Sequence, residues 1–302
     1  MNTAETMRTT FADVASRLLV EDPSVAVVLA DISAALFVDA RRRHPDRVIN
    51  VGIREQLLVS AGGGLALAGM RPIVHTFSTF LVERAFEQIK LDFCHQDVGG
   101  VLVSVGGSYD MAEAGRTHHG PGDVALIDTL PGWTVHVPGH AEEAAVLLRD
   151  AVESTGRVYV RLSSQSNGDA VAVRPGRFSV LRNGTGGTVI AVGPMLDPVM
   201  AATSGLDVTV LYAATVRPFD SATLFGTLGA ANIVIVEPYL AGTSSRLVSD
   251  VLIAVPHRLL ALGVRADELR RYGTPQDHAR AHGLDASGLR ASIQAFLAAG
   301  RL

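Results

Sequence analysis

The chain has 302 residues, of which 48% are hydrophobic and 19% charged, and its formal net charge is −4. This length and composition can bury one large domain core or two ordinary ones. The weakly acidic balance lacks the basic excess typical of nucleic-acid binding, so no nucleic-acid partner is expected.

A single cysteine, Cys94, excludes an internal disulfide framework and favours a reducing compartment. Its apolar neighbours indicate that it packs in a core rather than acting as a nucleophile. No run approaches the roughly 20 apolar residues that a membrane span needs. The first residues also lack the apolar segment of a signal peptide. We therefore expect a cytoplasmic protein without membrane contacts.

Short β-branched runs alternate with amphipathic segments in the first half of the chain, which is typical of a parallel sheet flanked by helices. The predicted strands are 25–30, 48–51, 71–77, 100–105, 134–137 and 157–161. The predicted helices are 4–20, 55–68, 81–94, 123–130 and 141–154. Residues 106–122 are rich in glycine and are expected to form a long loop. The glycines at 62–64 lack the lysine of a phosphate loop, which favours close helix packing.

The alternation resumes after residues 169–187, a stretch of weak periodicity that we interpret as a linker. The predicted elements are the strands 188–192, 208–212 and 232–236 and the helices 198–204, 221–228, 244–255 and 286–299. The expected fold class is therefore α/β. Two successive domains, 1–168 and 188–302, each have a mainly parallel, helix-flanked sheet.

Chemically versatile side chains follow the predicted strands of the first domain. In open parallel sheets ligands bind where loops leave the carboxyl ends of the strands. The residues at these ends are Asp31, Glu55, Phe77, Phe80, His118, His119 and Arg161. The sequence therefore predicts a binding site along one rim of the first sheet.

Several segments, in a fixed order, resemble the pyrimidine-binding and C-terminal domains of transketolases. In the first domain they read ADI (30–32), VGIREQ (51–56), AGGGLALAGMRPIVHTFSTFLVERAFEQIKLD (61–92), GRTHHGPGDVALIDTLPGWTVHVPG (115–139) and VYVRLSSQ (158–165). In the second they read TVIAVG (188–193), VTVLYAATVRPFD (208–220) and VEPYLAGTSSRLVSDVL (236–252). The stretch 61–92 is also similar to 1-deoxyxylulose-5-phosphate synthase. The resemblance covers nearly the whole chain.

The resemblance implies thiamine diphosphate as cofactor and Glu55 as the residue that activates it. The thiazolium carbon of this cofactor must lose a proton, which the cofactor's own aminopyrimidine removes in its imino form. A carboxylic acid bonded to the pyrimidine ring nitrogen favours that form, provided that it remains protonated in a dry setting. The neighbours Ile53, Leu57 and Leu58 suggest such a setting. The alternative for Glu55 is a helix-start acid that interacts with the helix dipole.

The resemblance also assigns cofactor contacts to Phe77, Phe80 and Asp31. Aromatic faces can position a flat heterocycle without competing for its hydrogen bonds. Core packing is the alternative for the two phenylalanines, and a capping role is the alternative for Asp31.

By the same resemblance, His118 matches the histidine of the G-x-T-H motif, which handles substrate oxygens and proton transfers. His119 replaces the glutamine usual at the next position, and Arg161 could meet a substrate oxyanion or stabilise an interface. No third ligand has a spacing suited to a metal, so no metal site is expected.

The chain lacks the G-D-G…N type segment with which the family holds the diphosphate through Mg²⁺. We therefore expect a split transketolase in which this chain is the second, beta-type subunit. The cofactor would lie between this chain and a diphosphate-binding partner of roughly similar size, which holds the Mg²⁺, in an α2β2 assembly.

Three positions depart from the family pattern. Ala114 stands where an aspartate reads a donor hydroxyl, Gly106 where a histidine is usual, and Ser164 where an arginine grips a sugar phosphate. Losing such a clamp removes charge-assisted bonds. The hypothesis is a nonphosphorylated sugar, or a 2-oxo acid donor in a biosynthetic route. Arg84, Arg116 or the partner could supply the clamp instead.

Two other functions remain open. The beta subunit of a 2-oxo acid dehydrogenase shares the split layout and the cofactor glutamate. A non-catalytic scaffold is the alternative outside enzymes, although the retained Glu55 favours an active transferase.

Overall fold

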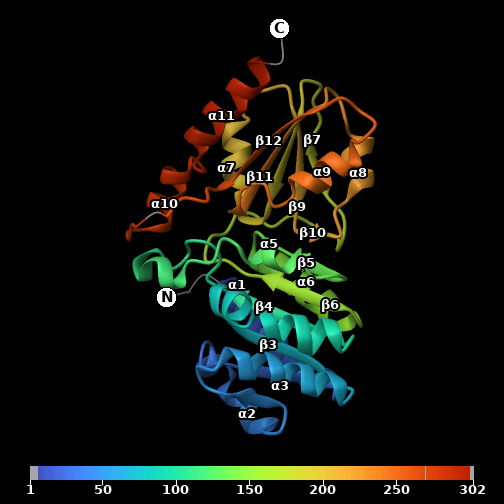
Figure 1. Cartoon of the computed structure of the whole chain (residues 1–302), viewed down its shortest axis with the longest axis vertical. Coiled ribbons are helices and arrows are strands. Elements are labelled where there is room, and N and C mark those ends of the chain that lie inside the picture. Colours follow the sequence, from blue (N-terminus) through green and yellow to red (C-terminus); the bar gives the residue numbers. More distant parts are fainter. Residues whose placement is uncertain (1–5, 269, 300–302) are drawn as a thin grey trace.

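Two twisted β-sheets organise the chain, and helices cover both faces of each sheet (Figure 1). The computed structural model describes residues 6–268 and 270–299. In Figure 1 the first half of the chain forms the lower unit and the second half the upper one. The fold class predicted from the sequence is confirmed.

The first sheet consists of parallel neighbours, except for its edge strand β10, which is antiparallel to β5. In spatial order the strands are β10 (Thr215–Arg217), β5 (Trp133–His136), β6 (Arg157–Arg161), β4 (Gly100–Val105), β3 (Arg71–Phe77), β1 (Val25–Leu29) and β2 (Val48–Asn50). Strands such as β1 are buried over their whole length. Continuous apolar runs of this kind are expected where helices cover both faces of a parallel sheet.

Two helical layers cover this sheet. One face packs against α1 (Met7–Glu21) and α6 (Ala141–Glu153). The other face packs against α3 (Glu55–Leu67), η2 (Thr79–Arg84), α4 (Phe86–Gln88), η3 (Ile89–His95) and α5 (Asp123–Ile127). The short helices η1 (Ala34–Phe37) and α2 (Val38–Arg43) connect β1 to β2.

The second sheet has the order β12 (Arg258–Val264), β11 (Asn232–Leu240), β8 (Thr188–Val192), β9 (Thr209–Ala213) and β7 (Ser179–Arg182). Only its edge strand β7 runs antiparallel to its neighbour. The helices on one face are α7 (Leu196–Ala202) and α11 (Ala286–Ala298), and those on the other are α8 (Ser221–Gly226) and α9 (Ser245–Val251). The turn η5 (Gly193–Met195) and the helix α10 (Pro275–His282) complete this unit.

The two units are not separate in the chain, because the second half contributes to the first sheet and to a shared apolar cluster. Strand β10 follows β9 in the chain yet joins the first sheet, and one apolar cluster includes strand residues of both sheets. The stretch 169–187, predicted as a linker, contains β7 and so contributes an edge strand to the second sheet. The domain limits drawn from the sequence remain a prediction.

Other differences from the predicted elements are local. The predicted helix 81–94 is helical but is divided into the π-helical segments η2 and η3 with α4 between them. The loop 106–122 contains a short 3-10 helix, η4 (Ala112–His118). Strand β12 and helix α10 were not predicted. No helix in the described part of the chain is long and apolar enough to cross a membrane.

The packing predicted for the glycines of α3 is present. A Cβ atom on Gly62 would meet Val74 Cγ2 at 2.5 Å, and one on Gly63 would meet Asp92 Cβ at 2.8 Å. The third glycine, Gly64, has no such neighbour. Two of the three glycines therefore let α3 approach β3 and η3 closely.

Candidate functional site

A cavity of about 630 Å³ opens at the carboxyl ends of β1, β2 and β3. Five of the seven site residues predicted from the sequence line it, namely Asp31, Glu55, Phe77, Phe80 and His118. Parallel strands bring these residues together because their carboxyl ends share one edge of the sheet. The cavity volume lies within the range of about 300–1,000 Å³ typical of small-molecule sites.

Glu55 is the buried acid of this cavity. It begins α3, and only 2% of its side chain is exposed. The predicted dry setting is only partly present, since Leu58 is buried whereas Ile53 is 69% and Leu57 49% exposed. The helical period places positions 55, 58 and 59 on the buried face and position 57 elsewhere. The apolar side chains of Ile53 and Leu57 are therefore exposed to solvent rather than packed around the Glu55 carboxyl.

Arg84 is the partner of this acid. Its Nη1 atom lies 2.6 Å from Glu55 Oε2, and its guanidinium lies 4.0 Å from the centre of the Phe80 ring. Arg84 comes from the end of η2, where Gln56 Nε2 donates to its carbonyl oxygen at 3.2 Å. The side chain of Arg84 remains 39% exposed. The pair thus joins a buried carboxylate to a cation that also contacts solvent.

Three rings form an aromatic wall. The centre of the Phe80 ring lies 6.0 Å from that of Phe77 and 5.1 Å from that of His118, in edge-to-face arrangements. The Nδ1 atom of His118 lies 3.0 Å from Thr117 Oγ1. A flat heterocycle can pack against such a wall, while His118 offers its other nitrogen to a reactant.

The turn after β1 shapes the opposite side of the cavity. Asp31 and Ser33 both adopt φ near 61°, in the left-handed region that non-glycine residues avoid. Asn50 holds this turn, because its amide nitrogen donates to Asp31 Oδ1 at 2.9 Å and its amide oxygen accepts from the backbone of Asp31 and Gly52. Strained residues of this kind concentrate at functional sites.

The sequence did not point to a polar chain behind this turn. His75 Nδ1 lies 2.9 Å from the carbonyl of Val103, which can only accept, so Nδ1 carries the proton. Burial lowers the pKa of His75 to about 3, and its neutral Nε2 accepts from the Ser33 hydroxyl at 2.9 Å. Arg8 Nε donates to the same hydroxyl oxygen at 2.9 Å and also lines the cavity. No motif marks Arg8 or Ser33 in the sequence.

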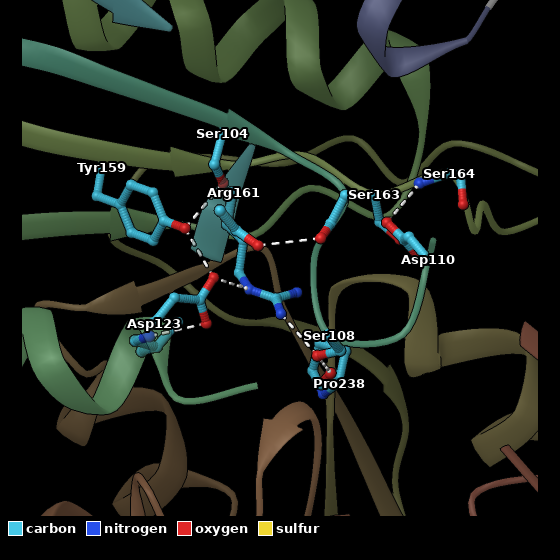
Figure 2. Close-up of polar contacts among 12 residues, drawn as sticks. Ser104, Ser108, Asp110, Asp123, Tyr159, Arg161, Ser163, Ser164 and Pro238 are labelled. Atoms are coloured by element: carbon cyan, nitrogen blue, oxygen red, sulfur yellow. Dashed lines mark hydrogen bonds and ion pairs between the residues drawn. The ribbon is translucent and has the colours of Figure 1, made fainter. Parts of the chain in front are cut away.

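Arg161 lies outside the cavity in a buried polar network (Figure 2). Its Nε donates to Asp123 Oδ2 at 2.7 Å and its Nη2 to Ser108 Oγ at 2.7 Å. Tyr159 donates to the same carboxylate oxygen at 2.7 Å, and Ser108 donates to the carbonyl of Pro238 in β11. Only 1% of Arg161 is exposed. The predicted contact with substrate is therefore not supported, and the alternative interface role fits this placement.

His119 lines a different cavity, of about 330 Å³, between the loop after β4 and helix α10. Its ring centre lies 4.9 Å from that of His278, and burial lowers the pKa of both histidines. The extended backbone at His119 turns its side chain away from that of His118. The predicted substrate contact of His119 is thus not supported by its position. Within residues 6–268 and 270–299, no three His, Cys, Asp or Glu side chains converge to hold a metal ion.

Comparison with known proteins identifies the family. Residues 4–168 match the family described as the transketolase pyrimidine-binding domain. The chain belongs to the transketolase family.

Three of the matched proteins are covered by this chain over most of their own length. One, 57% identical over 295 residues, is described as an uncharacterized 33.6 kDa protein in the fasciation locus of Rhodococcoides fascians and is covered to 95%. One of the subunits of an apulose-4-phosphate transketolase from Actinobacillus succinogenes is 28% identical, with 88% of this chain and 89% of that protein covered. A solved structure titled as a split-gene transketolase, an inactive beta4 tetramer, is 26% identical with a TM-score of 0.84, and 98% of this chain and 99% of that chain are covered.

Other transketolase-family relatives are about twice as long. The 1-deoxy-D-xylulose-5-phosphate synthase of Chlorobium luteolum is 29% identical, and the match takes in 95% of this chain but 48% of the enzyme. The transketolase of Pichia stipitis, at 18% identity and a TM-score of 0.78, is covered to 46% and supports the fold alone. The chain therefore spans about half the length of these family members.

The cavity residues fit the aminopyrimidine half of thiamine diphosphate. A flat ring with polar nitrogens needs aromatic surfaces and a carboxyl group at its edge, and the cavity supplies Phe77, Phe80 and Glu55. The cavity of about 630 Å³ has space for such a ring.

The structure shows the surroundings of the positions that depart from the family pattern. Gly106, with φ +70°, lies against Phe77, and a Cβ atom there would meet Phe77 Cδ1 at 2.8 Å. Ser164 is exposed, and its backbone nitrogen donates to Asp110 Oδ2 at 2.8 Å. The Ser163 hydroxyl and the Gln165 amide nitrogen donate to the other oxygen of Asp110. The loop after β6 is thus held by a carboxylate, and Ala114 and Ser164 bring no charge.

Proposed function

We propose that this chain is the beta-type subunit of a split transketolase that transfers a two-carbon ketol unit, or a related acyl-anion unit, with thiamine diphosphate. The observation that carries the proposal is the buried carboxyl of Glu55 beside the aromatic wall of Phe77 and Phe80. The match over nearly full length to one subunit of an apulose-4-phosphate transketolase and to a split-gene transketolase chain supports the split layout.

The roles of the residues follow from their positions. Bound thiamine diphosphate supplies a thiazolium carbon that can attack the carbonyl carbon of a ketose donor. Glu55 would donate a hydrogen bond to the pyrimidine ring nitrogen, and Phe77 and Phe80 would hold the faces of the ring. His118, at the rim of the same cavity, binds a substrate oxygen and moves a proton to or from it.

A partner chain would complete the site. Exposed Leu36 and Ile53 line the cavity, and exposed Val38 and Leu57 lie on the same two segments. Apolar side chains grouped around a ligand site are typical of an interface between subunits. We propose that the diphosphate and Mg²⁺ are held by a partner chain of similar size in an α2β2 assembly.

The donor is proposed to be a nonphosphorylated sugar or a 2-oxo acid. Ser164 lacks the positive charge that grips a sugar phosphate in the family pattern, and Ala114 lacks the carboxylate that reads a donor hydroxyl. Of the arginines that could replace the clamp, Arg116 lies in the other cavity, where its Nε is 3.2 Å from Glu268. Arg84 is paired with Glu55. Turnover of xylulose 5-phosphate with ribose 5-phosphate at rates normal for transketolases would contradict this donor class.

Reconstitution tests the function itself. The chain should co-purify with a diphosphate-binding transketolase chain, and the complex with thiamine diphosphate and Mg²⁺ should transfer ketol units. Glu55→Gln should lower turnover by about 10²–10⁴-fold, the usual contribution of a general acid or base. Glu87→Gln, an exposed acid of α4, is the matched control and should retain activity. Full activity of Glu55→Gln would exclude the proposed role of this acid.

Assays of the same complex distinguish the proposed function from two alternative functions. Reductive acylation of a lipoyl domain would identify a 2-oxo acid dehydrogenase beta subunit instead. A complex that binds its partner and tolerates Glu55→Gln in every assay of cellular function would identify a scaffold. The retained acid and aromatic wall favour the transferase.

A further inference from the structure

Arg84 contacts two groups that the proposed cofactor needs, namely the Glu55 carboxyl and the Phe80 ring. The guanidinium lies 2.6 Å from the Glu55 carboxylate and 4.0 Å from the centre of the Phe80 ring. A pyrimidine ring in this cavity would need the same carboxyl group and the same aromatic residue. Arg84 does not line the cavity itself, but its guanidinium contacts these two cavity residues from outside it.

The free and the bound chain require different protonation states of Glu55. A buried carboxyl in contact with a guanidinium is stabilised as the anion, because the charge-assisted hydrogen bond needs it. The pyrimidine ring nitrogen is an acceptor, and a carboxylate is an acceptor only, so these two groups cannot form a hydrogen bond. A protonated Glu55 can donate to the nitrogen. Glu55 must therefore gain one proton between the two states.

The other charged groups around Glu55 do not replace Arg84. Asp31, on the turn after β1, lies in the same cavity and disfavours a second negative charge. Arg8 of α1 is bonded to Ser33, and Arg54, next to Glu55 in sequence, donates to the carbonyl of Val51. His118, on η4, faces the cavity from the loop after β4. Among these groups, Arg84 is the cation in direct contact with the carboxylate.

We infer that Arg84 is a positioning residue that keeps Glu55 ionised until the cofactor displaces it, so that cofactor binding takes up one proton. This inference rests on the proposed function. Arg84 is 39% exposed, which lets the guanidinium withdraw toward water without becoming a buried unpaired charge. The proton comes from solvent and buffer and resides on Glu55 in the complex.

The charge state of Glu55 can be measured on the free chain. The infrared difference between wild type and Glu55→Gln at neutral pH should show an ionised carboxylate. In the Arg84→Met background the same difference should show a protonated carboxyl, because a buried acid without its cation takes up a proton. Arg54→Met, which removes an adjacent arginine without contact to Glu55, is the matched control and should resemble wild type. A protonated Glu55 in wild type would overturn the inference.

Proton uptake on binding is the second measurement. Titration calorimetry of the complex of both chains with thiamine diphosphate and Mg²⁺, in buffers of different ionisation enthalpy, gives the number of protons bound. Wild type and Arg54→Met should take up about one proton more than Glu55→Gln, while Arg84→Met should match Glu55→Gln. The wild-type Kd should also rise about tenfold per pH unit above neutrality, as linkage of one proton requires. Equal uptake in wild type and Arg84→Met would refute the coupling.

The two proposals fail in different ways. If the complex binds no thiamine diphosphate, the proposed function is wrong, whereas the infrared result still decides the state of the pair. If thiamine diphosphate binds with no difference among the variants, the function stands and the coupling is wrong. Should Arg84→Met not fold, Arg84→Gln removes the same charge with a polar side chain and serves in both measurements.

Discussion

Two arginine–carboxylate pairs of nearly equal length have opposite surroundings. Arg84 and Glu55 are 2.6 Å apart, the arginine is 39% exposed, and the glutamate lines a cavity. Arg161 and Asp123 are 2.7 Å apart, and both side chains are at most 1% exposed. Asp123 also accepts a hydrogen bond from Tyr159, and Arg161 also donates one to Ser108. The hydrogen-bond partner of the Glu55 carboxylate is Arg84.

The difference separates a replaceable pair from a permanent one. A buried pair whose remaining donors and acceptors are satisfied loses much when one partner is removed, because the other charge is left unpaired. A pair at a cavity can be opened, since water or a ligand takes over the exposed partner. The short distances alone do not distinguish these cases; the burial and the additional hydrogen bonds do.

Consecutive glycines after β4 lie between the aromatic wall of the cavity and the Arg161–Asp123 pair. A Cβ atom on Gly106 would meet the Phe77 ring at 2.8 Å, and one on Gly107 would meet Arg161 Nη1 at 2.6 Å. The loop that carries His118 therefore starts between the cavity wall and the buried network. Its small residues let both regions pack against the same piece of backbone.

The largest effect is expected for Arg161→Met. The substitution leaves the Asp123 carboxylate buried without its cation, which costs about 3–5 kcal/mol of the free energy of unfolding. Urea denaturation measures this loss. Arg149→Met is the control, because it breaks a 2.9 Å pair with Glu21 on the surface and should leave the midpoint nearly unchanged. A loss for Arg161→Met as small as that of the control would show that the network is not a permanent support.

A second effect concerns Glu237 of β11, a buried acid whose neighbouring arginine forms an ion pair with another carboxylate. Arg217 pairs with Asp128 at 2.5 Å, and burial raises the pKa of Glu237 from 4.5 to about 7. The folded chain then holds a proton that the unfolded chain releases between pH 4.5 and 7, so stability falls as pH rises through this window. The shift corresponds to about 3 kcal/mol at most.

Glu237→Gln removes this dependence. Unfolding free energies of wild type and variant should differ little near pH 4.5, and the variant should be the more stable above pH 7. Parallel pH profiles for the two proteins would contradict the raised pKa of Glu237. The two pH profiles therefore test how a buried carboxyl that is not paired with an arginine changes the unfolding free energy of this fold.

A smaller effect is expected for Gly106→Ala. The residue has φ +70°, where a side chain costs about 1–2 kcal/mol, and the added methyl group would press on Phe77. Stability should fall by this amount and cofactor affinity should weaken. Gly64→Ala is the control, because α3 has open space there and the change should stabilise by about 0.5–1 kcal/mol. Unchanged cofactor affinity in Gly106→Ala would show that Phe77 is not set by this contact.

The strands and the cavity were predictable from the sequence because both depend on local patterns. β3, β4, β6 and β8 have the predicted limits, since a buried strand reads as a continuous apolar run between turn residues. The carboxyl ends of neighbouring parallel strands lie at one edge of the sheet, which is why Asp31, Glu55, Phe77 and His118 share a cavity. Helix α10 also has a local signal that the prediction missed, the Thr274–Asp277 capping box with Pro275 at the first turn.

The rest depended on partners far apart in sequence. Arg161 ends a strand as an exposed site residue would, but Asp123, 38 positions away, and Ser108 enclose it. The antiparallel edge strands β7 and β10 are short and are fixed by their neighbours rather than by their own pattern. The Arg84–Glu55 contact joins residues 29 positions apart. Side-chain pairing over such distances leaves no periodicity in the sequence.

The smallest effect on stability is expected for Arg84→Met, and it is the most direct test of the comparison. The variant removes a partner at 2.6 Å, as Arg161→Met does at 2.7 Å. Glu55, however, adjoins a cavity and can take up a proton, and Arg84 was already in contact with solvent. Near pH 4.3, about the pKa of an unfolded glutamate, taking up this proton costs little, so the expected loss in urea denaturation at that pH is below about 1 kcal/mol, the range of exposed pairs. A loss comparable to that of Arg161→Met would mean that the Arg84–Glu55 pair supports the fold, and a pair of that kind could not yield to a ligand.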